Sequence, residues 1–208
     1  MVDPVNLKAF YDSGELKRPT VALRELQQNP EQFLKTYPIS IDEAQDSGVR
    51  TAYLRNGRVG WRPGSKLGTL NMHKTQEFIF SLSQPEGHAF QCQYVRMDPS
   101  DQAIQWYALA PAPDVMLTCK LTGCSFVVRQ NGPNVEVAHL QPKQETGLEL
   151  NQRLLTGGQK AFGRLKYDLE KRQAHVVAVR RGGTWEVYAQ KVDKAKEVGI
   201  RSVKKIWP

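Results

Sequence analysis

One stretch, residues 118–139, limits the possible folds of this chain more than any other. Two runs rich in β-branched and aromatic residues flank the dipeptide Asn131-Gly132, the strongest short-range signal for a β-hairpin. If this dipeptide forms the turn, Cys124 lies directly opposite His139. Directly paired residues hold their Cβ atoms roughly 4.5–5.5 Å apart, so a thiol and an imidazole come within mutual reach.

The alternation of side chains along these two strands also assigns the faces of the hairpin. One face is apolar and ends in a thiol and an imidazole: Cys124, Phe126, Val128, Val135, Val137 and His139. The other face carries Ser125, Arg129, Asn134 and Glu136. Pro133 has no N–H and cannot close the two-residue turn. A longer loop in the same register preserves the pairing, whereas a one-residue bulge turns His139 away.

The remaining periodicity predicts a helical start followed by many short strands. We expect an N-terminal helical segment at residues 1–40, and within it apolar stripes formed by Leu7, Phe10 and Tyr11 and by Val21, Leu23, Leu26, Phe33 and Leu34. Strands are expected at 49–54, 58–61, 77–82, 89–96, 104–108, 115–121, 174–180, 184–190 and 200–206, and a helix at 145–155. Asn56-Gly57 and Arg181-Gly182-Gly183 predict two further hairpins.

This order of elements indicates an α+β class, a largely antiparallel β-sandwich with flanking helices. We expect residues 41–208 to form this β-sandwich as one catalytic domain. No basic segment followed by an apolar run opens the chain, and no run of 18 apolar residues occurs, so neither a classical signal peptide nor a membrane span is expected.

Charge and cysteine content bound the possible partners. The net charge is +8, and residues 143–208 hold 15 Lys and Arg against 7 Asp and Glu, so the whole excess lies there. Three cysteines without a repeated spacing argue against a disulfide framework and for a reducing compartment. A zinc site remains an alternative, with the four ligands Cys92, Cys119, Cys124 and His139. We otherwise expect no metal and no organic cofactor.

The residue types around the hairpin fit nucleophilic catalysis. A cysteine nucleophile needs a base to take its proton, and the base needs a group that orients it. Cys124 and His139 meet the first need, and the Thr118 hydroxyl is a candidate partner for the far ring nitrogen of His139. Gly123 leaves room for a substrate carbonyl, and backbone N–H groups from Gly123 to Ser125 are candidate oxyanion donors. Alternatively, Cys124 and His139 are ordinary core residues.

The motif Thr118-x-x-Leu121-Thr122-Gly123-Cys124, followed by a strand, a turn and His139, resembles a known signature. It is similar to Thr-x-x-Leu-Ser-Gly-Cys…His of the glutamine deamidase toxins typified by Burkholderia lethal factor. It also resembles the Ser-Gly-Cys…His core of the cytotoxic necrotizing factor catalytic domain and the Gly-Ser-Cys…His arrangement of the chemotaxis deamidase CheD. Thr122 stands where that family has serine.

The resemblance implies a bacterial effector toxin that deamidates a glutamine side chain of a target protein, of the small GTPase or translation factor class. Cys124 is then the nucleophile, His139 the general base and Thr118 the third catalytic residue, and a thioester is the intermediate. Transglutamination is the expected side activity when an amine replaces water. The protein would act as a monomer in the cytosol of a target cell, secreted or injected without a classical signal peptide.

Two other functions stay open. A nucleic-acid or acidic-protein binding module would use the basic C-terminal region and two stacking tryptophans, namely Arg180, Arg181, Lys191, Lys194, Lys196, Lys204, Lys205, Trp185 and Trp207. Acidic residues interrupt this region and no nucleic-acid-binding signature occurs, so nucleic acid is the less favoured partner. A cysteine protease would use the same Cys124 and His139 pair.

Overall fold

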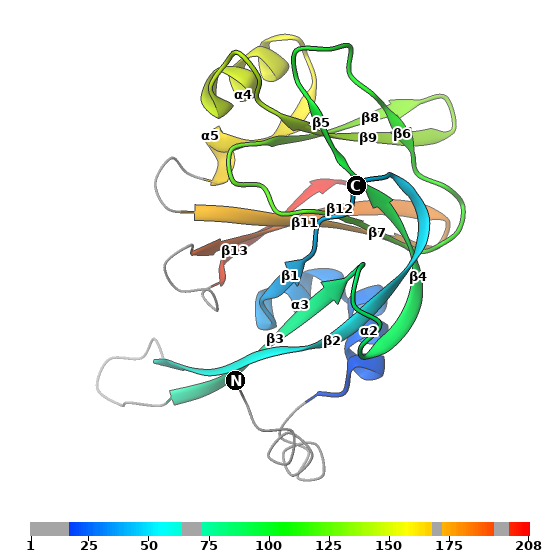
Figure 1. Ribbon diagram of the computed structural model, residues 1–208, viewed down its shortest axis with the longest axis vertical. Coiled ribbons are helices and arrows are strands. Elements are labelled where there is room, and N and C mark those ends of the chain that lie inside the picture. The colour runs from blue at the N-terminus through cyan, green and yellow to red at the C-terminus, as the bar shows by residue number, and fades with distance from the viewer. Residues whose placement is uncertain (1–16, 64–71, 168–171, 194–199) are drawn as a thin grey trace.

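The computed structural model describes residues 17–63, 72–167, 172–193 and 200–208, which form a mixed α+β fold around two sheets (Figure 1). The larger sheet has the strand order β1 (Ile39–Ile41), β3 (Met72–Ser81), β2 (Gly48–Pro63), β4 (His88–Val95), β7 (Val115–Thr118), β11 (Arg172–Arg181), β12 (Thr184–Asp193) and β13 (Ile200–Trp207). The smaller sheet has the order β10 (Lys160–Phe162), β8 (Ser125–Asn131), β9 (Asn134–Gln141) and β5 (Met97–Pro99), and β6 (Tyr107–Ala108) also pairs with β9.

The expected α+β class is confirmed, and most neighbouring strands are antiparallel. Parallel pairing occurs between β1 and β3, β4 and β7, and β5 and β9. One apolar core lies between the two sheets. It joins Phe126 and Val137 of the smaller sheet to Val176 and Trp185 of the larger sheet. This shared core makes the two sheets the layers of a sandwich.

The opposite face of the larger sheet is covered by two helices, α2 (Pro19–Gln28) and α3 (Pro30–Thr36). Each begins with proline, whose fixed φ and missing N–H suit the first helical position. Leu26, Phe33 and Leu34 are buried against the sheet in a second core. The expected apolar stripe at Leu7, Phe10 and Tyr11 lies outside the described residues.

The outer face of the smaller sheet carries α4 (Gly147–Thr156) (Figure 1). The short helix α5 (Arg164–Tyr167) contacts α4 and places Tyr167 in the core between the sheets. Thr146 and Glu149 form a capping box at the start of α4, in which the Thr146 hydroxyl accepts from the Glu149 N–H. Such a cap contributes about 1 kcal/mol to helix stability. Leu150 and Leu154 then pack α4 onto the sheet.

The chain passes from the larger to the smaller sheet at two places, from β4 to β5 and from β7 to β8. The second passage is the loop at residues 119–124. A bridge to β11 fixes its middle, because Leu121 N–H donates to the Ala174 carbonyl at 2.8 Å and the Ala174 N–H donates back at 3.1 Å. The residues singled out by the sequence motif lie along and beside this passage.

The prediction of a hairpin at Asn56-Gly57 is wrong. β2 runs straight through this dipeptide and pairs with β3, with a register irregularity between Asn56 and Val59. A Cβ on Gly57 would lie 2.7 Å from a Glu77 carboxylate oxygen. The dipeptide therefore marks an irregularity within a long strand and a close side-chain approach, two other common uses of glycine in strands.

The turn expected at Arg181-Gly182-Gly183 and the helix expected at residues 145–155 are confirmed. Gly182 and Gly183 form the turn between β11 and β12 with φ values of 55° and 86°, as a primed hairpin turn requires. The helix expected at 145–155 is α4, which ends at Gly157. The last expected strand is β13, and the strands expected at 104–108 and 115–121 are shorter than predicted.

Candidate active site

The register of the β8–β9 hairpin differs from the prediction by two residues. His139 lies opposite Phe126, not opposite Cys124, and Asn131 pairs with Asn134. The turn residues are therefore Gly132 and Pro133, and Gly132 has a φ of 58°. Because Pro133 lacks an N–H, it cannot pair across a closing turn, and it takes a turn position where no N–H is needed.

A shift of two residues keeps every side chain on its predicted face, because the period of a strand is two. Cys124, Phe126, Val128, Val135 and Val137 all belong to the core between the sheets. The side chains predicted for the opposite face point outward, and Arg129 and Glu136 form a salt bridge there. Cys124 and His139 are thus diagonal neighbours on the inner face, because the residue paired with His139 is Phe126, two positions after Cys124.

Thr118 and His139 are in contact. The Thr118 Oγ1 lies 2.7 Å from His139 Nδ1, and both residues are fully buried. Thr118 comes from β7 of the larger sheet and His139 from β9 of the smaller one, so the hydrogen bond joins the two layers. The sequence predicted this pair from the Thr118 spacing and the resemblance.

The second ring nitrogen of His139, Nε2, is buried without a hydrogen-bond partner. Burial lowers the pKa of His139 to about 3, so the imidazole is neutral near pH 7. A neutral imidazole has one nitrogen that donates and one that accepts. With the proton on Nδ1, donated to Thr118 Oγ1, the lone pair lies on Nε2. This is the arrangement that a general base requires.

The Cys124 thiol is buried and contacts Met97. The distance from Cys124 Sγ to Met97 Sδ is 3.2 Å. Met97 is also the parallel-strand partner of His139, since β5 lies at the edge of β9. Cys124 and Met97 therefore lie on the two segments that flank the strand of His139 in the smaller sheet.

The pKa of Cys124 is raised to about 12, chiefly by burial and then by the nearby Cys119. The backbone amides of Thr122 and of Cys124 itself act in the opposite direction, because they donate toward Sγ and favour the thiolate. Near pH 7 the two groups are therefore a neutral thiol and a neutral imidazole.

Cys119 is a second thiol beside the imidazole. Its Sγ lies 3.7 Å from His139 Nδ1, the nitrogen that already contacts Thr118. Burial raises the pKa of Cys119 to about 11. The sequence named Cys119 only as a zinc ligand, so its position next to the imidazole was not predicted.

The loop at residues 119–124, which we call the cysteine loop, is held in place by contacts from α4 and α5. The Tyr167 hydroxyl donates to the Cys124 carbonyl at 2.9 Å, and Tyr167 is fully buried. A Cβ on Gly147 would lie 2.1 Å from the Gly123 carbonyl oxygen, so only glycine permits this contact between α4 and the loop. Gly123 is half-buried, and the position of its own missing Cβ has Arg164 Nη1 as a neighbour at 3.8 Å.

Ser125, a predicted backbone donor, begins β8 and points its side chain to the α4 side. Its Oγ is buried without a hydrogen-bond partner, as is Nδ2 of Asn151. Both atoms lie around Gly163, at 2.1 and 2.6 Å from the position of its missing Cβ. The Ser125 hydroxyl is therefore on the face opposite the Cys124 thiol, and only its backbone remains a candidate for oxyanion binding.

The zinc alternative is contradicted by the position of Cys92. This cysteine belongs to the core under α2 and α3, whereas Cys124 belongs to the core between the sheets. Within the described segments, no three His, Cys, Asp or Glu side chains are grouped as a metal ion requires. All three cysteines are free thiols.

The basic C-terminal region is largely engaged with acidic groups where it is described. Glu186 accepts from both Arg181 and Lys205, and the pKa of Glu186 is lowered to about 2 by these contacts against the effect of its partial burial. Trp185 is only 4% exposed and cannot stack on a base. Lys194 and Lys196 lie outside the described residues.

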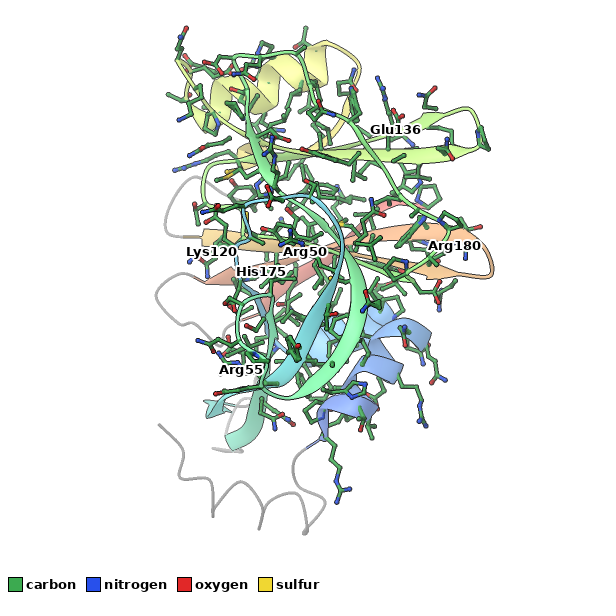
Figure 2. All side chains as sticks on the ribbon, turned by 45° about the vertical axis from the view of Figure 1, so that its right-hand side comes forward. Arg50, Arg55, Lys120, Glu136, His175 and Arg180 are labelled. Atoms are coloured by element: carbon green, nitrogen blue, oxygen red, sulfur yellow. The ribbon has the colours of Figure 1, made fainter. Side chains whose placement is uncertain are left out.

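Charged side chains also mark the two ends of β11. Lys120, on the cysteine loop, lies beside His175 at one end, and Arg180 lies at the other (Figure 2). Burial, and then the Lys120 charge, lower the pKa of His175 to about 4. The side chain of Lys120 is exposed, so it belongs to the surface around the cysteine loop rather than to the buried site.

No protein-family model matches this chain, and no curated protein matches it in sequence. None of the helices in the described segments is long and apolar enough to span a bilayer.

Proposed function

We propose that this protein is a cysteine-dependent protein-glutamine deamidase, with Cys124 as nucleophile and His139 as general base. The observation that carries the proposal is the 2.7 Å contact between Thr118 Oγ1 and His139 Nδ1, which leaves the buried Nε2 without a partner. A buried polar atom without a hydrogen bond costs about 1–3 kcal/mol, and a role as proton acceptor explains why His139 Nε2 is kept in this state.

The position of Cys124 supports the same proposal. It lies on the inner face that His139 shares, at the start of β8, and Gly123 precedes it on a half-buried loop. The amides of Thr122 and Cys124 that donate toward Sγ stabilise a thiolate as it forms. The resemblance to deamidase toxins selected these same residues from the sequence.

In the proposed reaction, the Cys124 thiol gives its proton to His139 Nε2 while Sγ bonds to the carbonyl carbon of a glutamine side chain. The tetrahedral intermediate collapses, and the leaving nitrogen takes the proton from His139 and departs as ammonia. Water then attacks the thioester, again assisted by His139, and releases glutamate and the free thiol. Thr118 is the positioning residue that holds the imidazole throughout.

The proposed setting is a bacterial effector toxin that acts, as a monomer, on a protein in the cytosol of a target cell. Three free, buried thiols suit a reducing compartment. Its substrate is a protein glutamine of a small GTPase or translation factor class. With a primary amine in place of water, the same thioester gives a transglutamination product.

The test uses a panel of glutamine-containing proteins and measures both ammonia and the mass of each target peptide. Deamidation raises the peptide mass by about one unit, because an amide becomes a carboxylic acid through the acyl-enzyme. Reaction in ¹⁸O water labels the new carboxylate, which distinguishes enzymatic hydrolysis from spontaneous deamidation that took place before the assay. Chain fragments without a mass shift would instead indicate a protease.

The control variants are Cys124→Ser, Cys119→Ser and Cys92→Ser. We expect only Cys124→Ser to abolish ammonia release, although all three replace a buried thiol. Circular dichroism establishes that each variant is folded. Equal activity of the wild type and Cys124→Ser would refute the proposed enzyme, and loss only in Cys119→Ser would reassign the nucleophile.

A further inference from the structure

The Met97 side chain blocks the nucleophile. Its Sδ is 3.2 Å from Cys124 Sγ. A carbonyl carbon must come within roughly 3–3.5 Å of the attacking atom before reaction. Met97 Sδ therefore already occupies a position at reacting distance. Cys124 is 5% exposed and His139 is fully buried, so a substrate cannot reach either group in this arrangement.

Met97 presents this atom in the manner of a substrate residue. Methionine and glutamine have unbranched side chains, and in both the third side-chain atom follows two methylene groups: Sδ in methionine, the amide carbon in glutamine. Met97 lies on a short strand, β5, that pairs in parallel with β9 directly beside His139. The atom facing the thiol is thus the one that corresponds to the carbon under attack.

The segment around β5 is held by hydrogen bonds, whereas the thioether of Met97 has a thiol as its neighbour. Asp98 accepts from Arg96 Nε at 2.8 Å and from the Tyr107 hydroxyl at 2.7 Å. The Ser100 N–H donates to the Gln141 carbonyl at 2.9 Å. Met97 itself is half-buried, packs against the rim of the core between the sheets, and has three rotatable side-chain bonds.

We propose that Met97 occupies the subsite of the substrate glutamine and swings out when the substrate enters. This inference rests on the proposed deamidase activity for the identity of the ligand, a glutamine side chain. The closed state keeps Cys124 protonated and shielded. Entry of the glutamine replaces the thioether beside Sγ with the amide carbon, within reach of His139.

The first test measures blocking alone, without any deamidase assay. Iodoacetamide alkylates Cys124, and peptide mapping by mass spectrometry follows the rate at that residue. We expect Met97→Ala to raise the rate roughly tenfold or more, since local opening is no longer needed. Met97→Leu keeps the bulk and should stay near the wild-type rate.

A matched control separates blocking from general loosening of the core. Met116 is fully buried in the same core, so Met116→Ala removes an equal volume away from the thiol. Acceleration in Met97→Ala but not in Met116→Ala supports the subsite. An unchanged rate in Met97→Ala, or equal rates in both variants, overturns it.

The second test converts the blocking residue into a substrate. In Met97→Gln the new amide carbon faces Sγ, and we expect attack, loss of ammonia and hydrolysis at position 97. The product carries a mass increase of about one unit that is absent when Cys124→Ser is combined with Met97→Gln. No mass change, together with fast alkylation in Met97→Ala, overturns the reaction and leaves the subsite standing.

Discussion

Two buried polar side chains, Gln190 and His139, lie on opposite sides of the larger sheet. They differ in how many of their polar atoms have hydrogen-bond partners. Gln190 lies under the helices, where Nε2 donates to the Leu34 and Tyr37 carbonyls, both at 2.7 Å, and Oε1 accepts from the Ile39 N–H at 2.9 Å. His139 lies between the sheets, where Thr118 and Cys119 both contact Nδ1 and Nε2 has no hydrogen-bond partner.

The difference separates a structural polar residue from a candidate catalytic one. Gln190 uses three of its hydrogen-bonding positions to join α3, β1 and β12, so its contacts stabilise the fold. His139 keeps Nε2 unused, and Cys124 and Met97 lie on the two segments that flank its strand. An orphan nitrogen alone does not define a site, because His175 Nδ1 is also buried without a partner, and the charge that acts on His175 is the cation Lys120.

The largest effect expected from this comparison is in His139→Ala. Loss of a general base lowers rates by roughly 10²–10⁴-fold, so we expect deamidation per folded molecule to fall by that factor. His175→Ala, which also removes a buried imidazole, should leave the activity of the folded protein unchanged. Ammonia release, normalised to the folded fraction from circular dichroism, checks both. Equal losses of deamidation rate in the two variants would contradict a catalytic role for His139 that His175 lacks.

Thr118→Ala should have the next largest effect. Without the hydroxyl the His139 ring is no longer held, and a misplaced catalytic group costs on the order of 10²-fold in rate. Thr118→Ser retains the oxygen and should restore most of the activity, which a purely structural role of the threonine methyl would not allow. The measurement is kcat for the three proteins on one target.

Gln190→Ala should show the opposite pattern, with lost stability and retained activity. It leaves two carbonyls and one N–H without partners, which we expect to cost about 2–4 kcal/mol of unfolding free energy. Urea unfolding gives that value, and ammonia release is measured at a temperature where the variant is still folded. A rate loss in the folded variant would contradict a purely structural role.

The last expected effect is a pH dependence of stability caused by both histidines. Burial lowers the pKa of His139 to about 3 and of His175 to about 4, below the unfolded value near 6.5. The unfolded chain therefore binds protons that the folded chain does not, as pH falls below about 6.5. Each histidine should remove up to about 1.4 kcal/mol of stability per pH unit until its folded pKa is reached.

Urea unfolding at pH 7.5, 6.0 and 5.0 tests this pH dependence. His175→Gln should reduce the slope by the share of one proton, and the same change at His139 should do likewise. A stability that is flat from pH 7.5 to 5.0 would contradict the burial of neutral imidazoles.

The alternation of inward-facing and outward-facing side chains along the hairpin could be predicted from the sequence, because it depends only on the two-residue period of a strand. Cys124 and His139 therefore lie on the predicted inner face. The register could not be predicted with the same certainty, since two adjacent turn dipeptides, Asn131-Gly132 and Gly132-Pro133, compete. The missing N–H of Pro133 decides for the second and places Cys124 diagonal to His139.

Contacts between distant segments account for the residues that sequence reasoning missed. Met97 and Tyr167 carry no local signal, since their roles come from pairing across β5 and β9 and from the hydrogen bond to the Cys124 carbonyl. The hairpin predicted at Asn56-Gly57 is the opposite case. A strong local turn signal is present, but the dipeptide lies within the sixteen residues of the continuous strand β2. Thr118 was found because its spacing from Cys124 belongs to the motif.

The two passages of the chain from the larger to the smaller sheet have a consequence for the order of folding. Thr118 belongs to the larger sheet, His139 to the smaller one, and Cys124 and Met97 follow the segments that connect them. A folding intermediate with only one sheet formed has neither the oriented imidazole nor the shielded thiol. Protection of Cys124 from alkylation should therefore report completion of the native topology, since the thiol becomes shielded only when both layers have docked.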